Sequence, residues 1–375
     1  MEKIRLSKSI LGKDEAAAVA RTIEQDGYLG MGTEVQAFEA ELAQYLGVDP
    51  QDVACVNSGT AALHLATQAV ARPGDEVLVQ SLTFVASFQA ISAAGATPVA
   101  CEVLPQSFTI DLEDAKQRIT LRTRAIMPVH YASNPGDLDA IYEFAKLHGL
   151  RVIEDAAHAF GGAYKGRKVG SFGDIRCFSF DGIKNITSGE GGAIVTSDPV
   201  VAAMVKDARL LGVEKDTQQR YAAQRSWEFD VKHQGYRYHM SNLFAAIGRV
   251  QLKRLDAEFA PQRVLLGKRY RARLSDLPGV ALLDGELGPI VPHIQPLRVL
   301  NGRRDTVRTA LDEAGVETGV HYKPNHLLSL YGGGQMHLPV TEGLYKELLS
   351  LPLHPGLVEE DVDRVCDIVA GVVSR

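Results

Sequence analysis

The chain has 375 residues, 45% of them hydrophobic, which is long enough for a large core or for two domains. Charged residues make up 23% and the formal net charge is −6, so there is no general basic field of the kind that holds nucleic acid. The four cysteines are far apart and form no CxxC pair, so we expect neither a disulfide scaffold nor a metal site.

The N-terminal stretch MEKIRLSKSILGKDE lacks the apolar core of a signal peptide. No apolar run in the sequence reaches the roughly 18 to 20 residues that span a bilayer. We therefore expect a protein of the reducing cytoplasm, with no membrane partner and no nucleic-acid partner.

Short β-rich runs alternate with helical patterns through the first two-thirds of the chain. Within residues 34–47, Val35, Phe38 and Leu42 recur at helical spacing and Gly47 ends the pattern. Five apolar runs bounded by turn or charged residues lie between such helices, at residues 75–80, 97–103, 124–130, 151–156 and 191–196. This alternation predicts βαβ units and a mostly parallel sheet with helices on both faces.

The pattern changes after about residue 240. Residues 241–274 predict a long amphipathic helix that bridges two lobes, and helices of a smaller α+β unit are predicted over 305–316 and 357–373. We thus expect an α/β protein with two domains. The large α/β domain would span residues 1–245, and the small C-terminal α+β domain, with the bridging helix, residues 246–375.

In an open α/β sheet, ligands gather at the carboxyl ends of the strands. The chemically notable residues follow those ends: 58–60, 83–84, Asp155, His158 and Lys184. We expect the functional site there.

The first candidate feature is the stretch Asn-Ser-Gly-Thr at residues 57–60, which follows a strand and opens an apolar helix. Ser58 is a suitable N-cap, and Gly59 lets the backbone approach a ligand closely. The N–H groups exposed at a helix start suit a phosphate. The alternative is a well-capped helix without a ligand.

The second feature is Asp155, which ends an otherwise apolar strand three residues before His158. A carboxylate in this place can pair with a protonated ring nitrogen through a charge-assisted bond worth about 1.5–3 kcal/mol. A carboxylate that caps the next helix, beside a histidine with only local partners, is the alternative.

The third feature is Lys184, in a stretch (178–192) rich in Gly, Ser and Thr and poor in other charges. An ordinary lysine, with a pKa of about 10.4, is a poor nucleophile near neutral pH. Burial or a nearby positive charge lowers that pKa and allows Schiff-base chemistry. The alternative is a lysine whose stem lies along the strand end with its head in water. Ser179 is expected to point to the same side as Cys177 and Asp181.

A phosphate cradle, a carboxylate for a ring nitrogen and a Schiff-base lysine, in this order, together describe a pyridoxal 5'-phosphate site. At these residues the chain resembles the DegT-type (DegT/DnrJ/EryC/StrS) sugar aminotransferases, which have the aspartate-aminotransferase fold, fold type I. The matching segments are FEAELAQYLG, VNSGTAALHLA, SLTFVAS, VIEDAAHAFG, FSFDGIKNITSGEGG, GYRYHMSNLFAAIG and VHYKPNH, in the order of the family and over nearly the whole chain.

The resemblance implies roles for individual residues. Lys184 would form the Schiff base with pyridoxal 5'-phosphate and move the proton between cofactor and substrate, the cofactor passing through its pyridoxamine form. Asp155 would keep the pyridine nitrogen protonated. The other implied cofactor contacts are with the phosphate (Gly59, Thr60 and Ser179), the ring face (Phe84) and the ring hydroxyl (His158).

Members of this family are homodimers whose active sites borrow residues from the partner chain, and GYRYHMSN at residues 235–242 matches the borrowed segment. Many relatives carry Asn where this chain has Arg237, an arginine able to bind a phosphate bidentately. We predict it as a cofactor contact, with a solvent-facing arginine as the alternative. His321 and Tyr322 match a segment near the active-site mouth and are predicted to contact substrate or to serve packing.

The resemblance implies a transaminase (EC 2.6.1 type) that moves an amino group, from glutamate, to a keto carbon of a nucleotide-linked deoxysugar. Such amino sugars feed bacterial surface polysaccharides or natural products. One alternative is a nucleotide-sugar dehydratase on the same scaffold, but there the lysine is typically replaced by histidine. A second is a sensory or regulatory homologue without turnover. The intact Lys184, Asp155 and phosphate cradle argue against it, as does the lack of a DNA-reading motif.

Overall fold

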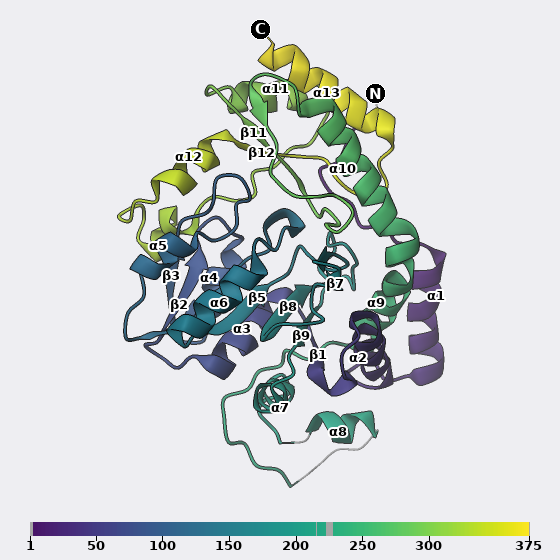
Figure 1. The fold of residues 1–375 in the computed structure, drawn as a ribbon. Helices are drawn as coiled ribbons and strands as arrows, with labels where there is room; N and C mark the ends of the chain where they lie inside the picture. The colour runs from purple at the N-terminus through teal and green to yellow at the C-terminus, as the bar shows by residue number, and fades with distance from the viewer. Residues whose placement is uncertain (1–2, 215, 223–227, 375) are drawn as a thin grey trace.

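The structure, a computed structural model, describes residues 3–214, 216–222 and 228–374. A seven-stranded sheet lies at the centre of the larger part of the molecule, with strand order β1-β9-β8-β5-β4-β2-β3 (Figure 1). Its strands are β1 (Val53–Val56), β2 (Glu76–Gln80), β3 (Thr97–Cys101), β4 (Thr123–Met127), β5 (Arg151–Asp155), β8 (Ile175–Ser179) and β9 (Gly192–Val195). Within this sheet β9 runs antiparallel to both of its neighbours and the other six strands share one direction. The predicted mostly parallel sheet is confirmed, and all five predicted runs form strands.

Helices cover both faces of this sheet, because successive strand residues point to opposite sides. On one face lie α3 (Gly59–Val70), α4 (Val85–Ala93) and α7 (Pro199–Ala208). On the other lie α5 (Leu112–Gln117) and α6 (Leu138–His148), together with α2 (Thr33–Leu46) and α9 (Asn242–Arg254). The strand β2 shows the alternation: Val77 and Val79 join the apolar cluster of α3, whereas Leu78 joins that of α6. Both layers follow from the predicted βαβ pattern.

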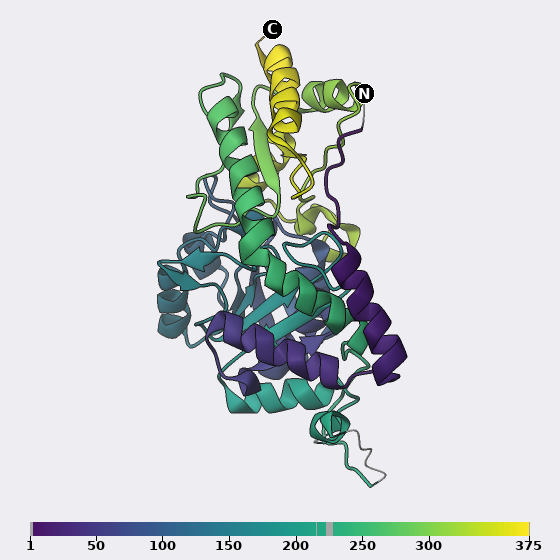
Figure 2. The same cartoon turned by 90° about the vertical axis from the view of Figure 1, so that its right-hand side faces the viewer.

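A long helical stretch joins this layer structure to a smaller unit (Figures 1 and 2). The helix α9 begins after the N-cap Ser241 and passes through a π-helical segment, Leu255–Phe259, into α10 (Ala260–Leu274). The predicted helix over 241–274 is therefore confirmed, with its π-helical interruption, while its role as a bridge between two domains stays a prediction. The helix α9 packs on the large sheet and α10 on the small one, so this helical stretch contacts both parts of the molecule.

The smaller unit is built on an antiparallel sheet of β10 (Val280–Ala281), β11 (Gln295–Val299) and β12 (Leu348–Leu351). Its apolar cluster is shared by α10, α11 (Arg304–Glu313) and α13 (Glu359–Val373). Ile4, near the N-terminus, pairs with Val316 and belongs to the same cluster, so both chain ends lie in this unit (Figure 1). The division into residues 1–245 and 246–375 stays a prediction.

The remaining helices and strands are peripheral. They are α1 (Lys13–Arg21), α8 (Asp216–Tyr221), α12 (Pro339–Glu347) and the hairpin of β6 (Ala163–Tyr164) and β7 (Arg167–Lys168). Within the described ranges, no helix has both the length and the apolar character needed to cross a membrane.

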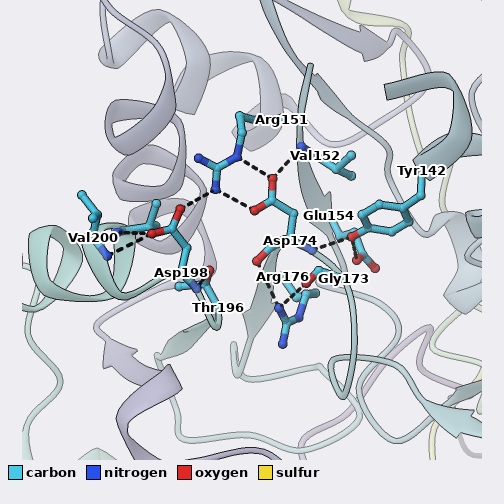
Figure 3. A network of polar contacts seen from close by, with 11 residues as sticks. Tyr142, Arg151, Val152, Glu154, Gly173, Asp174, Arg176, Thr196, Asp198 and Val200 are labelled. Carbon is cyan, nitrogen blue, oxygen red and sulfur yellow. Dashed lines mark hydrogen bonds and ion pairs between the residues drawn. The ribbon is translucent and has the colours of Figure 1, made fainter. Parts of the chain in front are cut away.

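An ionic network fastens the starting ends of β5 and β8 (Figure 3). Arg151, the first residue of β5, donates two hydrogen bonds of 2.7 Å to the carboxylate of Asp174, which directly precedes β8. A third, of 3.1 Å, reaches Asp198, the N-cap of α7. The network thus links the starting ends of these two strands, which lie at the opposite end of the sheet from their carboxyl ends.

Candidate active site

A cavity of about 390 Å³ opens at the carboxyl ends of the parallel strands. Its walls come from the segments that follow β1, β2, β4, β5 and β8, as expected for an open α/β sheet. The structure brings together nine of the ten predicted site residues around it: Gly59, Thr60, Phe84, Asp155, His158, Ser179, Lys184, His321 and Tyr322. Residues separated by more than 250 positions in the sequence thus share one site.

The start of α3 forms one end of this cavity. Ser58 caps the helix, its Oγ accepting a 3.1 Å hydrogen bond from the N–H of Ala61. The N–H groups of Gly59 and Thr60 precede the first hydrogen bond within the helix, so the helix offers them no acceptor. A Cβ on Gly59 would lie 2.7 Å from the Cβ of Ser179, so only glycine allows this close approach of helix and strand. The result is a small concave surface of donors that fits a phosphate.

Asp155 also lines the cavity and is buried. Its carboxylate accepts a 2.7 Å hydrogen bond from Ser87 Oγ and a 3.2 Å hydrogen bond from the N–H of Ala157. Burial raises the pKa of Asp155, although the hydrogen bond from Ser87 acts in the opposite direction. A carboxylate buried at a cavity wall is stabilised by a cationic ring nitrogen beside it, so this residue fits a protonated pyridine.

Lys184 lies in the turn that follows β8, where its N–H donates a 3.1 Å hydrogen bond to the carbonyl of Asp181. Burial lowers the pKa of Lys184, while the negative charges of Asp181 and Asp155 act in the opposite direction. A lowered pKa increases the fraction of neutral amine, the nucleophilic form. The side chain faces the same cavity as the helix start and Asp155.

His158 and the aromatic residues close the side of the cavity. The Nε2 atom of His158 lies 3.0 Å from the hydroxyl of Tyr322, and its ring centroid lies 4.5 Å from that of His293. Burial, together with the charge of Lys184, holds the pKa of His158 well below its usual value, so this imidazole is neutral. Phe84 keeps 54% of its surface exposed and packs its ring 5.4 Å from Tyr322. An exposed ring at a cavity wall is suited to stacking on a ligand ring.

His321 completes this side. Its Nδ1 lies 2.8 Å from the hydroxyl of Ser350, and burial lowers its pKa to about 4. At neutral pH it is therefore an uncharged hydrogen-bonding group at the cavity.

The tenth predicted residue, Arg237, lies elsewhere. It lines a separate cavity of about 260 Å³ together with Arg220 and His239. Its own carbonyl accepts a 3.3 Å hydrogen bond from the side-chain amide of Asn57, just before α3. The segment thus runs beside the helix start, but the structure does not bring the guanidinium into the cavity of its own chain.

Three polar residues at the site were not predicted: Ser87, Glu190 and His293. Ser87 lies one helical turn after Phe84 in α4, so helical spacing could have indicated that it faces the site. Glu190 lines the cavity from the glycine turn after Lys184, where it is the only charged residue of that turn's sequence GEGG. No local pattern pointed to His293, because its place beside His158 arises from contact between the two units.

Taken together, the helix start, the buried carboxylate and the lysine fit pyridoxal 5'-phosphate by their own geometry. A phosphate fits the donors around Gly59 and Ser179, and a pyridine nitrogen fits Asp155. Lys184, which burial shifts toward its neutral form, lines the same cavity and would supply the nucleophile for an aldehyde carbon. Each part of the cofactor has a chemically matched partner in one cavity.

Comparison with known sequences gives a consistent result. The profile of the DegT/DnrJ/EryC1/StrS aminotransferase family matches residues 10–370. The spore coat polysaccharide biosynthesis protein SpsC of Bacillus subtilis is 38% identical over 98% of this chain and 96% of its own length. A dTDP-4-dehydro-2,3,6-trideoxy-D-glucose 4-aminotransferase of Saccharopolyspora spinosa is 36% identical over 97% of this chain and 95% of its own length.

Solved structures resemble the fold over its full length. The putative sugar aminotransferase Spr1654 of Streptococcus pneumoniae, in its PLP form, superposes with a TM-score of 0.90 at 28% identity, covering 100% of this chain and 99% of that one. Its PMP form gives a TM-score of 0.91 at the same identity, with 100% and 98% covered. The α/β architecture described above is thus that of a known group of sugar aminotransferases.

Proposed function

This chain belongs to the DegT/DnrJ/EryC1/StrS aminotransferase family, and on that basis we propose that it aminates a keto carbon of a nucleotide-linked deoxysugar. The amino donor would be L-glutamate and the cofactor pyridoxal 5'-phosphate. The name of the S. spinosa relative, which specifies a dTDP-linked keto-sugar, supports this acceptor class. The PLP and PMP forms of Spr1654 support the cofactor.

The observation that carries the proposal is that Lys184, Asp155 and the start of α3 line one cavity. When bound, the cofactor supplies an electrophilic carbon and a ring that accepts electrons. The N–H groups of Gly59 and Thr60, with the hydroxyl of Ser179, hold the phosphate. Asp155 holds the proton on the ring nitrogen.

Lys184 serves twice in this proposal. Its neutral Nζ would be the attachment point that holds the cofactor, and the free amine would hold and move the proton at the substrate carbon. Phe84 covers one ring face, and neutral His158 orients the ring hydroxyl. His321 and Tyr322 border the space left for the sugar and the donor.

We propose further that the active form is a homodimer in which Arg237 of the partner subunit reaches the cofactor phosphate. Among the described residues that line the cavity, Lys184 is the sole lysine or arginine, so the phosphate has no permanent cation from its own chain. Mixing Lys184→Ala chains with Arg237→Ala chains tests this arrangement. A shared site predicts that mixed dimers recover activity that neither variant has alone, whereas sites contained within one chain predict no recovery.

The test of the reaction itself uses the full-length chain with pyridoxal 5'-phosphate, ¹⁵N-labelled glutamate and a panel of dTDP- and UDP-linked 3-keto and 4-keto sugars. We expect mass spectrometry to find ¹⁵N in one sugar nucleotide, with 2-oxoglutarate formed in equal amount. Loss of water from the sugar without gain of nitrogen would instead identify the dehydratase. No change in any sugar nucleotide would contradict the proposed acceptor class.

A further inference from the structure

Arg263, in α10, is buried without a carboxylate partner. Its side chain is 2% exposed, and Nη1 donates hydrogen bonds of 3.3, 3.2 and 3.4 Å to the carbonyls of Pro292, His293 and Leu353. Its Nε is buried and has no hydrogen-bond partner. A buried charge with only neutral partners is unfavourable for folding, and its field extends to the groups around it.

A second buried arginine of the chain makes the contrast clear. Arg209 is as deeply buried as Arg263, but its guanidinium lies 2.5 Å from the carboxylate of Glu39. The positive charge of Arg209 is therefore neutralised where it lies. Within the described ranges, Arg263 has no carboxylate oxygen within 4 Å, so its field is not cancelled locally.

Arg263 and Lys184 both line a small cavity of about 10 Å³, together with Ser9 and Gln251. Lys184 also lines the substrate cavity, so it borders both spaces. The other walls of the small cavity come from the N-terminal segment, the turn after β8, and the helical stretch of α9 and α10.

The segment 291–293 links Arg263 to the turn that carries Lys184. Asn185, which follows Lys184, donates a 3.1 Å hydrogen bond to the carbonyl of Val291. Arg263 donates to the next two carbonyls of the same segment. The guanidinium and the backbone of this turn are therefore anchored to the same three residues.

The charges around Lys184 oppose one another. Asp155 and Asp181 face it and favour the ammonium form, and the carboxylate of Glu190 lies in the same substrate cavity. Lys8 also lines the small cavity of about 10 Å³ and adds positive charge there. Because Lys8 is exposed, solvent screens its field.

The histidines near Lys184 do not offset these carboxylates. Burial holds the pKa values of His158 and His293 well below the usual range and that of His321 at about 4, so all three are uncharged near neutral pH. The buried charge of Arg263 is thus the principal positive field opposing the two aspartates.

We propose that Arg263 is a positioning residue for the amino-transfer site, whose buried and uncompensated charge favours the neutral amine of Lys184. The proposal rests on the proposed function, in which Lys184 must be neutral to attach the cofactor. The alternative is that Arg263 only holds residues 291–293 and Leu353 together. That structural role would need the hydrogen bonds of the guanidinium but not its positive charge. That difference can be measured.

The test labels Lys184 in the full-length chain after removal of cofactor. The rate of its acetylation is followed by peptide mass spectrometry across a pH series, and the midpoint of the profile reports when the amine becomes neutral. In Arg263→Gln and Arg263→Met, we expect the midpoint to rise by about one pH unit. Arg263→Lys should keep the midpoint of the unchanged chain. So should Arg271→Met, which removes an arginine of the same helix bound only to the carbonyl of Leu283.

An unchanged midpoint in the two neutral variants would overturn the proposal. An equal rise in Arg263→Lys would overturn it too, since packing rather than charge would then be responsible. If these two variants do not fold, Arg263→His replaces them, since its imidazole keeps an N–H donor and is uncharged in the pH range of the labelling: a raised midpoint supports the proposal and an unchanged one overturns it. No donor, acceptor or cofactor enters this experiment, so its failure and the failure of the proposed reaction are separate results.

Discussion

Charged residues lie at or next to both ends of the strands β5 and β8. The two ends differ in how these charges are compensated by charges of opposite sign. At the starting end, Arg151 is bound to two carboxylates, and one of them, Asp174, also accepts a 3.1 Å hydrogen bond from the N–H of Val152 (Figure 3). The hydrogen bond with Asp174 raises the pKa of Arg151, so this guanidinium is more firmly charged than usual. The other carboxylate, Asp198, caps α7 through two N–H groups.

At the carboxyl end the charges are buried and only partly compensated. Burial raises the pKa of Asp155 and lowers that of Lys184, so each group is pushed toward its neutral form. The Nδ1 atom of His158 is buried without a hydrogen-bond partner. The compensated charges at the starting ends hold the two strands together. The partly compensated charges at the carboxyl ends are suited to bind a charged ligand or to exchange a proton. The comparison predicts that substitutions at the two ends will affect different properties.

The largest effect is expected from Lys184→Ala. Because the variant loses both the attachment point and the group that moves the proton, we expect amino transfer to fall by at least about 10⁴-fold. The free energy of unfolding without cofactor should stay the same or rise, since a partly buried amine is removed. Stopped-flow absorbance with glutamate measures the first property and urea titration the second. A variant that keeps its rate but loses stability would reverse the proposed difference between the ends.

Asp155→Asn should reduce the rate by about 10- to 100-fold, the worth of one charge-assisted hydrogen bond of about 1.5–3 kcal/mol. Stability should not fall at pH 7. Burial raises the pKa of Asp155 in the folded state, so above that pKa the ionised carboxylate is less favourable in the folded chain than in the unfolded chain, where water solvates it. Asparagine removes this charge. A less stable variant at pH 7 would show that the carboxylate serves folding instead.

Asp174→Ala, at the starting end, should lower the stability of the fold and leave the rate of amino transfer unchanged. The variant loses the paired hydrogen bonds from Arg151 and the bond from Val152, which are partly exposed, so unfolding should become easier by about 1 kcal/mol. The rate per folded molecule should not change. Urea titration, with exposed Asp276→Ala as the matched control, measures the first effect. A lowered rate in fully folded Asp174→Ala would mean that the two ends are not independent.

The smallest effect concerns pH. Because the pKa of Lys184 is lowered on folding, the folded state resists protonation of this amine, and the penalty is full below the lowered pKa. The penalty disappears as pH rises toward the unfolded value of about 10.4. The cofactor-free chain should therefore gain about 1 kcal/mol or less between pH 7 and pH 10, relative to Lys184→Met over the same range. Parallel pH profiles for the two chains would contradict a lowered pKa.

Much of the fold could be predicted from the sequence, because its signals are local. The five predicted strands are short apolar runs, and the long helical stretch continues across a π-helical segment. The meeting of Gly59, Asp155 and Lys184 was predictable as well, since each follows a strand of one parallel sheet and the carboxyl ends of parallel strands share an edge.

What the sequence could not supply comes from contacts between distant segments. Nothing near Arg263 in the chain marks it as a neighbour of Lys184, since the contact depends on how α10 crosses from one unit to the other. His293 reaches the site in the same way. For Arg237 the sequence suggested a cofactor contact, and the structure places it at another cavity, which is why we propose that role only for the Arg237 of a second chain.

The most direct test of the account is the visible absorption spectrum of the chain reconstituted with pyridoxal 5'-phosphate, recorded before and after addition of glutamate. We expect a yellow band from lysine-attached cofactor that bleaches with glutamate, and no such band in Lys184→Ala. A yellow band that persists in Lys184→Ala, or a chain that stays colourless with excess cofactor, would contradict the assignment of the site.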